Sequence, residues 1–354
     1  MTDDLLLPVL QHCCCLLTRW CLCLQYSITS LDPSANRSML ILGAATVDTM
    51  YALVGDFVGA NRSAFVGSGG SAGPVGSAGK YGSSIDALSG PIYAAAVMQR
   101  WKNSSGVAPP PLLFAWVRGM CHVPANITRY NSSWSSHDSS ALSLPRTVAV
   151  DEHDRPMFEV APELRALRIG PVAAARGLTL PPRNAAKPVA TPVALPAAAN
   201  GDAVEIIVTL PCQQQPNATL SLALRSTGAA ATPVAGWEGA FLTLALSGAN
   251  GMTMQTRSDP SFRCFSTSLA DSSKAVSPPP LLGAATCVLR VFVDHSVVSV
   301  SLNGGLRTLT GRVYPSQPAA ATKAFLLNGG GAAVAVGSVE AWGMRSIWQP
   351  SSAD

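Results

Sequence analysis

The stretch VFVDHSVVSVSLNGGLRTLTGRVYP, residues 291–315, has an Asp-His-Ser triplet at positions 294–296. These are the residue types of a hydrolytic triad, but triad members come together from separate parts of a fold. Consecutive strand residues point to alternate faces, so this triplet is not arranged for that relay. Residues 289–293 and 297–302 are apolar and β-branched, which predicts two strands. We therefore interpret the triplet as the turn between them.

The Asn-Gly-Gly sequence at 303–305 predicts a second reversal, because Asn and Gly adopt positive φ at little cost. Working outward, short apolar segments separated by turn residues recur from residue 202 to residue 348. Regularly spaced short strands of this kind predict an all-β sandwich.

Composition supports many short strands and turns rather than long helices. The 354 residues include 30 Gly and 27 Pro, and the net charge is only +4. No basic run is present, so nucleic acid is not an expected partner. Five of the nine cysteines lie in the first 23 residues without a zinc-type repeat, and the five His are scattered. We predict no metal and no cofactor.

The first 37 residues are interpreted as a separate, uncertain leader that is apolar and rich in Cys. Asp3 and Asp4 stand where a signal peptide carries positive charge, and His12 and Arg19 interrupt the apolar segment. The segment is also short and broken for a transmembrane helix, so a membrane anchor is not expected. A poor signal-anchor and a misplaced start of the reading frame both remain open.

Six N-x-S/T sequons favour passage through the secretory pathway to an extracellular or vacuolar destination. The alternative is accidental sequons in a Ser-rich chain. The six candidate glycosylation sites are Asn36, Asn61, Asn103, Asn126, Asn131 and Asn217.

The rest of the chain divides by composition. Short strands are predicted between residues 38 and 168, at 39–44, 50–57, 92–98, 112–117 and 141–150, with a helical turn or short strand at 162–168. Prolines at 171, 181, 182, 188, 192 and 196 predict a linker over 169–200 with no regular ladder. The sandwich is assigned to 201–348, and a tail to 349–354.

The segment 289–315, followed by GSVEAWGMRSIW, resembles the sandwich domain of family-32 glycoside hydrolases, which are invertases, fructan hydrolases and fructosyltransferases. Ser299 stands where that family has Glu, and Ser301 where it has an aromatic residue, which questions one inter-domain hydrogen bond and one packing contact. The matching positions are Asp294, Ser296, Val297, Val298, Asn303, Gly304, Gly305, Thr310, Arg312, Tyr314 and Pro315.

The middle of the chain is similar to the same family more loosely, so that the resemblance covers about residues 45–348. YALVGDF at 51–57 resembles a propeller strand, and LLFAWV at 112–117 keeps one Trp of the family's I-x-W-G-W strand. The resemblance implies an incomplete five-bladed β-propeller over 38–168. It also implies that Tyr81 and Trp116 line a fructose pocket, although aromatic residues of propeller strands are more often core.

Members of this family cleave fructosides with retention, using two carboxyl groups about 5–5.5 Å apart. Their motifs W-M-N-D-P-N-G, Glu-Cys and Arg-Asp-Pro are absent from this sequence: Asp32-Pro33 lacks the flanking residues, and Asp259-Pro260 falls in the sandwich. We therefore assign no catalytic residue. The acids at 151, 152 and 154 are interpreted as a solvated turn beside Arg155.

The chain thus resembles the back half of a β-fructofuranosidase, with sucrose or fructans as its sugars and no activity on its own. The missing propeller half would come from another chain or from upstream sequence. The alternative function is a non-catalytic carbohydrate-binding or structural β-sandwich protein. Because some plant members carry a disulfide in the sandwich, the resemblance implies a Cys212–Cys264 bridge, against two buried thiols.

Overall fold

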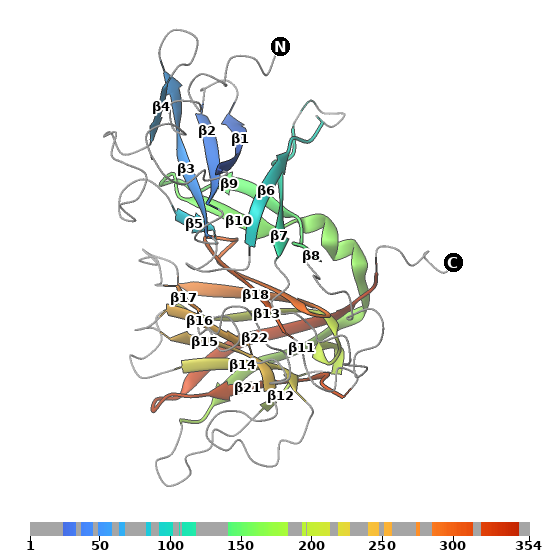
Figure 1. Cartoon of the computed structure of the whole chain (residues 1–354). Helices are drawn as coiled ribbons and strands as arrows, with labels where there is room; N and C mark the ends of the chain where they lie inside the picture. Colours follow the sequence, from blue (N-terminus) through green and yellow to red (C-terminus); the bar gives the residue numbers. More distant parts are fainter. Residues whose placement is uncertain are drawn as a thin grey trace, which may run out of the picture. The chain divides into compact units, whose positions relative to one another are not determined.

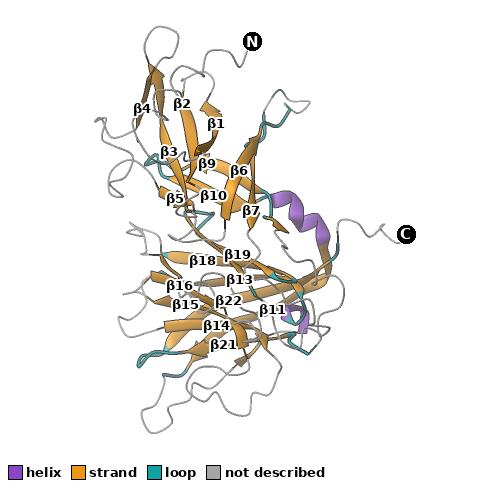
Figure 2. Ribbon diagram, in the orientation of Figure 1, coloured by secondary structure: helices purple, strands orange, loops and turns teal. Residues whose placement is uncertain are grey.

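The computed structural model consists almost entirely of β-strands, which confirms the predicted fold class (Figures 1 and 2). It describes residues 24–32, 37–44, 49–58, 64–67, 83–85, 92–101, 106, 108–117, 141–182, 193–195, 197–212, 219–226, 240–247, 251–256, 274–276, 285–313 and 320–346. The chain divides into two compact units. One comprises Met1–Trp116 and Leu142–Ala161, and the other comprises Val117–Ala141 and Pro162–Asp354.

The first unit contains two antiparallel sheets, with strand orders β1-β2-β3-β4 and β10-β9-β7-β6; β5 pairs with β3, and β8 pairs with β7. The strands are β1 (Leu24–Asp32), β2 (Arg37–Ala44), β3 (Thr49–Val58), β4 (Ala64–Gly67), β5 (Ser83–Ile85), β6 (Ile92–Met98), β7 (Leu112–Val117), β8 (Ala141–Leu142), β9 (Arg146–Val150) and β10 (Pro156–Val160). Each sheet has five strands, and four of them form a continuous antiparallel path that resembles a four-stranded propeller blade.

Apolar residues at alternate positions of these strands form one core between the two sheets. The buried cluster comprises Met39, Ile41, Met50, Ala52, Val54, Ile92, Leu113, Ala115, Val148 and Phe158. At one edge of this core, Arg37 of β2 donates a hydrogen bond to Asp56 of β3 at 3.2 Å and ion-pairs with Asp154 in the β9–β10 turn. The two sheets of the first unit are therefore joined by apolar packing and by a shared arginine.

Two expectations for this region need correction. Residues 24–32 do not belong to a separate leader, because they form β1 and pair with β2 from Leu24↔Ala44 to Asp32↔Arg37. The strand predicted at 141–150 is divided into β8 and β9 by residues 143–145, where Pro145 removes a ladder donor. The strands predicted at 39–44, 50–57, 92–98 and 112–117 are confirmed as β2, β3, β6 and β7.

The second unit is a sandwich of two six-stranded sheets, with strand orders β11-β22-β13-β18-β19-β20 and β12-β21-β14-β15-β16-β17. Its strands are β11 (Arg168–Leu180), β12 (Val193–Ala194), β13 (Ala203–Pro211), β14 (Thr219–Ser226), β15 (Ala240–Ser247), β16 (Gly251–Thr256), β17 (Lys274–Val276), β18 (Thr286–Asp294), β19 (Val297–Leu302), β20 (Arg307–Arg312), β21 (Lys323–Asn328) and β22 (Val334–Met344). The predicted helical turn is the 3-10 helix η4 (Pro162–Leu167), and a second, η5, spans Ala197–Ala199.

Alternation along β13 and β18 separates an apolar face from a polar face. Val204, Ile206 and Val208 of β13 are buried with Leu289 and Val291 of β18. Their antiparallel register, Ile206↔Val291, puts these side chains on one face of the sheet. The opposite face carries Glu205 and Arg290, which are also buried.

The linker expected over 169–200 is wrong for its first third. Residues 168–180 form β11, an edge strand paired with β22 from Arg168↔Met344 to Leu180↔Val334. The register shifts between Ile169 and Ala173, and Pro171 lies inside that irregularity. An edge strand with a bulge tolerates a proline because the missing N–H is not needed there.

None of the helices described here has the length and apolar character that a membrane crossing requires.

Candidate functional site

The Asp-His-Ser triplet is a turn, as predicted. β18 ends at Asp294 and β19 begins at Val297, and His295 has a φ of 51°. The Ser296 residue is buried, and its carbonyl oxygen accepts a hydrogen bond from the Val313 backbone N–H at 2.8 Å. The triplet therefore closes a hairpin rather than presenting a nucleophile.

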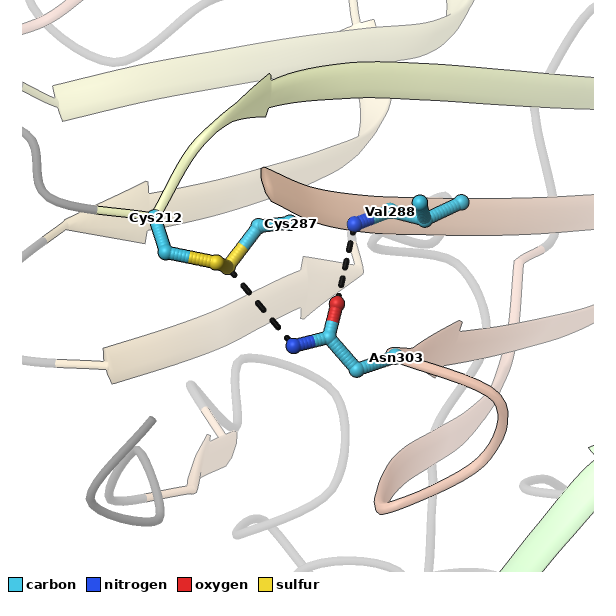
Figure 3. The surroundings of a disulfide bond; sticks show 4 residues. All are labelled: Cys212, Cys287, Val288 and Asn303. Carbon is cyan, nitrogen blue, oxygen red and sulfur yellow. Dashed lines mark hydrogen bonds between the residues drawn. A yellow bond between two sulfur atoms is a disulfide. The ribbon is translucent and has the colours of Figure 1, made fainter. Parts of the chain in front are cut away.

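The Asn-Gly-Gly reversal is also confirmed, with φ values of 49°, 68° and 87° at Asn303, Gly304 and Gly305. Asn303 holds this turn against β18 (Figure 3). Its backbone N–H donates to the Val288 oxygen and its Oδ1 accepts from the Val288 N–H, both at 2.9 Å, while Nδ2 lies 3.7 Å from Sγ of Cys287. The residues that carry the resemblance at this turn thus have a structural role.

Of the other residues that carry the resemblance, the structure describes some and not others. Arg312 is buried at the end of β20, opposite Val297 in the register. Tyr314 and Pro315 lie outside the described residues, as do Tyr81 and all six sequon asparagines, Asn36, Asn61, Asn103, Asn126, Asn131 and Asn217.

The predicted Cys212–Cys264 bridge is wrong for Cys212. Cys212 is bonded to Cys287, with Cα atoms 4.8 Å apart (Figure 3), and Cys264 lies outside the described residues. Cys212 directly follows β13, and Cys287 is the register partner of Leu210. The neighbouring strands β13 and β18 therefore bring these two cysteines together at the end of their ladder.

A buried ion-pair network that no sequence motif indicated lies on the polar face of the same sheet. We call Arg168, Glu205 and Arg290 the Glu205 network. The Glu205 carboxylate is fully buried and accepts hydrogen bonds from Nε and Nη2 of Arg168, both at 2.8 Å, and from Nε of Arg290 at 2.7 Å. The contact with Arg168 is bidentate, the geometry in which a guanidinium group and a carboxylate bond most strongly.

Aromatic rings complete this network. Trp342 and Phe292 are the register partners of Glu205 on its two neighbouring strands. The guanidinium carbon of Arg168 lies 3.6 Å from the centre of the Trp342 ring, and that of Arg290 lies 4.8 Å from the centre of the Phe292 ring. Cation–π contacts of this kind stabilise arginines that have lost much of their water.

The same face continues as a buried polar surface across β19 and β20. Ser301 of β19 is the register partner of Arg290 on one side and of Thr308 on the other. Ser299 of β19 is likewise the register partner of Phe292 and of Thr310. All four hydroxyl residues are buried. Serines therefore occupy a buried face at positions 299 and 301, where the resembled family has a Glu and an aromatic residue.

The predicted solvated turn at 151–155 holds for Glu152 but is wrong for Asp151. The Asp151 side chain is only 15% exposed, against 85% for Glu152. Asp151 accepts hydrogen bonds from the backbone N–H groups of His153 and Arg155, and from Nε of Arg155 at 2.6 Å. Asp151 thus organises the β9–β10 turn.

Neither Asp151 nor Glu205 is suited to donate a proton at neutral pH. Burial raises the pKa of Glu205, but hydrogen bonds and charge from Arg168 and Arg290 outweigh it, so the pKa is lowered below its ordinary value. Burial also raises the pKa of Asp151, but hydrogen bonds from Arg155 and His153 outweigh this effect, so the pKa of Asp151 is lowered as well. The acid of a retaining hydrolase needs the opposite shift.

Trp116 is placed differently from a core aromatic. Along β7, Leu113, Ala115 and Val117 are buried, whereas Trp116 on the other face is 48% exposed. The side chain therefore lies outside the apolar core of its unit. Within the described ranges, no group of three or more His, Cys, Asp or Glu residues is arranged to hold a metal ion.

These features define an all-β protein in which a two-sheet sandwich follows propeller-like sheets, the architecture of sugar-cleaving enzymes of the fructosidase type. Residues 177–343 match the family described as "Glycosyl hydrolases family 32 C terminal". Within the chain, residues 177–343 are therefore assigned to the C-terminal domain of glycosyl hydrolase family 32.

Two curated relatives match in sequence. One, named "Acid beta-fructofuranosidase 2, vacuolar", from Rosa hybrid cultivar, is 38% identical over 77 residues, which cover 21% of this chain and 12% of the relative. The other, "Acid beta-fructofuranosidase 4, vacuolar", from Arabidopsis thaliana, is 33% identical over 94 residues, which cover 25% of this chain and 14% of the relative.

Solved structures show the likeness in fold. The fructan 1-exohydrolase IIa of Cichorium intybus has a TM-score of 0.63 at 14% identity, covering 92% of this chain and 61% of its own. The exo-inulinase of Aspergillus awamori has a TM-score of 0.63 at 18% identity, covering 92% and 57%. A further structure of the Cichorium intybus enzyme was solved in complex with 1-kestose (TM-score 0.57, 15% identity, covering 92% and 61%). The chain thus spans less than two thirds of the proteins it resembles.

Proposed function

We propose that this chain is a β-fructofuranosidase-like protein of carbohydrate metabolism whose ligands are fructose-containing sugars such as sucrose and fructans. The observation that carries the proposal is the match of residues 177–343 to the family-32 C-terminal domain. The fold likeness to an enzyme crystallised with 1-kestose supports the choice of sugar class.

We further propose that the 354 residues do not cleave fructosides by themselves. Retaining hydrolysis needs one ionised carboxyl group to attack and one protonated carboxyl group to donate to the leaving oxygen. The sequence has no W-M-N-D-P-N-G and no Glu-Cys motif, and arginine neighbours hold Glu205 and Asp151 ionised. The catalytic pair would come from a polypeptide that supplies the other propeller blades.

The proposed location is the secretory pathway, ending in the vacuole or outside the cell. A Cys212–Cys287 disulfide is favoured by an oxidising compartment, and six sequons are compatible with passage through it. Two curated relatives are named vacuolar.

Purified protein incubated with sucrose, 1-kestose or inulin is expected to release no fructose above a heat-treated control, because the pair of carboxyl groups is missing. Chromatography of free fructose over a day measures this. Fructose release by the chain alone would contradict the inactivity proposal. Release only after mixing with a polypeptide that carries the remaining blades would support both parts of it.

A second candidate function, sugar binding without turnover, is favoured by the exposure of Trp116, because exposed aromatic faces stack on sugar rings. Calorimetric titration with 1-kestose is expected to show binding that weakens about fivefold in Trp116→Ala, equivalent to the roughly 1 kcal/mol of one aromatic contact. The matched control is Trp101→Ala, because Trp101 is 94% exposed in the β6–β7 loop. Equal affinity for 1-kestose in both variants and the parent chain would show that Trp116 does not contact the sugar.

A further inference from the structure

The imidazole of His295 lies between two carboxylates at one corner of the sandwich. Its Nδ1 atom is 2.8 Å from Oδ1 of Asp294, and its Nε2 atom is 3.6 Å from Oδ2 of Asp202. All three side chains are more than half exposed, so water and protons reach them. Asp202 directly precedes β13, whereas Asp294 ends β18, so the ring spans two neighbouring strands.

The backbone holds the ring in this position. The His295 N–H donates to the Asp202 carbonyl oxygen at 2.6 Å, one step beyond the Ala203↔Asp294 pair of the β13–β18 ladder. His295 also has positive φ, a conformation in which His, Asn and Asp are enriched among non-glycine residues. The ring is therefore presented to both acids by the turn itself.

The protonation state of His295 decides whether the ring attracts one carboxylate or both. A neutral imidazole has one N–H and donates to one carboxylate, while its other nitrogen turns a lone pair toward the second. An imidazolium has two N–H groups and carries a positive charge, so it attracts both carboxylates. Protonation thus converts a contact within β18 and its turn into a link between two strands.

Other charged groups border this corner. Arg225, on β14 of the opposite sheet, acts electrostatically on His295 and on Asp202. Arg312 is opposite Val297 on β20, and Lys323 is opposite Ser226 on β21. The hydrogen bond to Asp294 is the largest effect on the ring, and with the Asp202 charge it outweighs burial and Arg225, so the pKa of His295 is raised above its ordinary 6.5.

We propose that His295 is an acid-operated clasp that, when protonated, ties the start of β13 to the β18–β19 turn through Asp202 and Asp294. The clasp closes in an acidic compartment and loosens toward neutral and alkaline pH. It is independent of any fructoside chemistry, because it lies in the sandwich and needs no sugar.

The direction of the pH effect follows from the raised pKa. The folded chain binds the proton more tightly than the unfolded chain, so the clasp contributes fully below the unfolded value of about 6.5. Its contribution is lost as pH rises from there through the folded value. Acid therefore closes this corner, whereas deprotonation at higher pH opens it.

The direct test is an NMR titration of the histidine ring signals in the full chain labelled with carbon-13 histidine. The His295 midpoint is expected above 6.5, and both Asp202→Asn and Asp294→Asn are expected to lower it. A midpoint at or below 6.5, or one that neither variant moves, would overturn the proposal.

Hydrogen exchange at the residue 295 amide provides a local readout that does not depend on global unfolding. Its protection factor is expected to fall by up to about tenfold per pH unit over the titration window, the limit for one linked proton. In His295→Asn, which keeps a residue tolerant of positive φ, the protection factor should be independent of pH. The matched control His153→Asn removes an exposed imidazole from the β9–β10 turn and should leave the residue 295 profile unchanged. A His295→Asn profile that follows the parent chain would count against the clasp.

Discussion

Glu205→Gln is expected to destabilise the sandwich by about 3–5 kcal/mol, the usual cost of removing one partner from a buried ion pair. The substitution keeps the size of the side chain but leaves the charges of Arg168 and Arg290 without the carboxylate that they both contact. Urea unfolding at pH 7, followed by tryptophan fluorescence, measures the loss. Trp342, one of the seven tryptophans that contribute to this signal, lies against Arg168.

The matched control is Glu340→Gln on the neighbouring strand β22, where the residue is only partly buried. Removal of that charge is expected to cost less than about 1 kcal/mol. A Glu205→Gln loss no larger than the control loss would show that water reaches the network and screens it.

Acidification tests the same network without a substitution. Because the pKa of Glu205 is lowered in the folded chain, its contribution is present above the unfolded value of about 4.5 and is lost as pH falls through the folded value. The Glu205 network and the His295 clasp therefore respond to pH in different ranges and with opposite signs. A stability maximum in mildly acidic solution is the combined expectation.

The sequence predicted the strands and turns of this sandwich well, for local reasons. Residues 289–293 and 297–302 are mostly β-branched and apolar, and both segments are strands. The first extends beyond the expected ends, to Thr286–Asp294, and the second has the expected ends, Val297–Leu302. The Asn303-Gly304-Gly305 turn was predictable because positive φ favours these residue types. Such features depend on neighbours along the chain, so they can be read from the sequence alone.

The misses depend on contacts between distant segments. Pro171 led to the prediction that residues 169–200 form no strand ladder. However, β11 is an edge strand, and its bulge accommodates the proline ring. Glu205 is the single acid in the apolar segment AVEIIVTL, which signalled that a buried carboxylate needs a partner. Nothing local identified those partners, because Arg168 and Arg290 lie 37 and 85 residues away.

The cysteine pairing failed for the same reason. Cys212 and Cys264 both belong to the sandwich region, but β13 lies between β22 and β18, and it is β18 that carries Cys287. Sheet order, rather than sequence spacing, decides which thiols meet. The β13–β18 pair is thus fastened at one end by the disulfide, at the other by Asp202 and His295, and between them by the Glu205 network.

Loss of the Cys212–Cys287 disulfide is expected to lower the stability of the sandwich by up to about 4 kcal/mol. The bond joins residues 75 positions apart, so in the unfolded chain it closes a long loop and removes the entropy of that loop. The double variant Cys212→Ser/Cys287→Ser tests this by urea unfolding without reductant. Asn303→Ala is the companion variant, because it removes the amide beside Cys287 Sγ and the side-chain bond to Val288 while leaving the disulfide in place.

Reductant separates the two effects. Dithiothreitol should lower the unfolding midpoint of the parent chain and of Asn303→Ala, but it should shift the midpoint of the double serine variant less, because the Cys212–Cys287 bond is no longer there to reduce. Mass spectrometry of a non-reduced digest should yield a linked peptide pair containing Cys212 and Cys287. A Cys212–Cys264 pair, or a midpoint in the parent chain that reductant does not move, would show that β13 and β18 are held by their ladder and by the Glu205 network without a covalent bond.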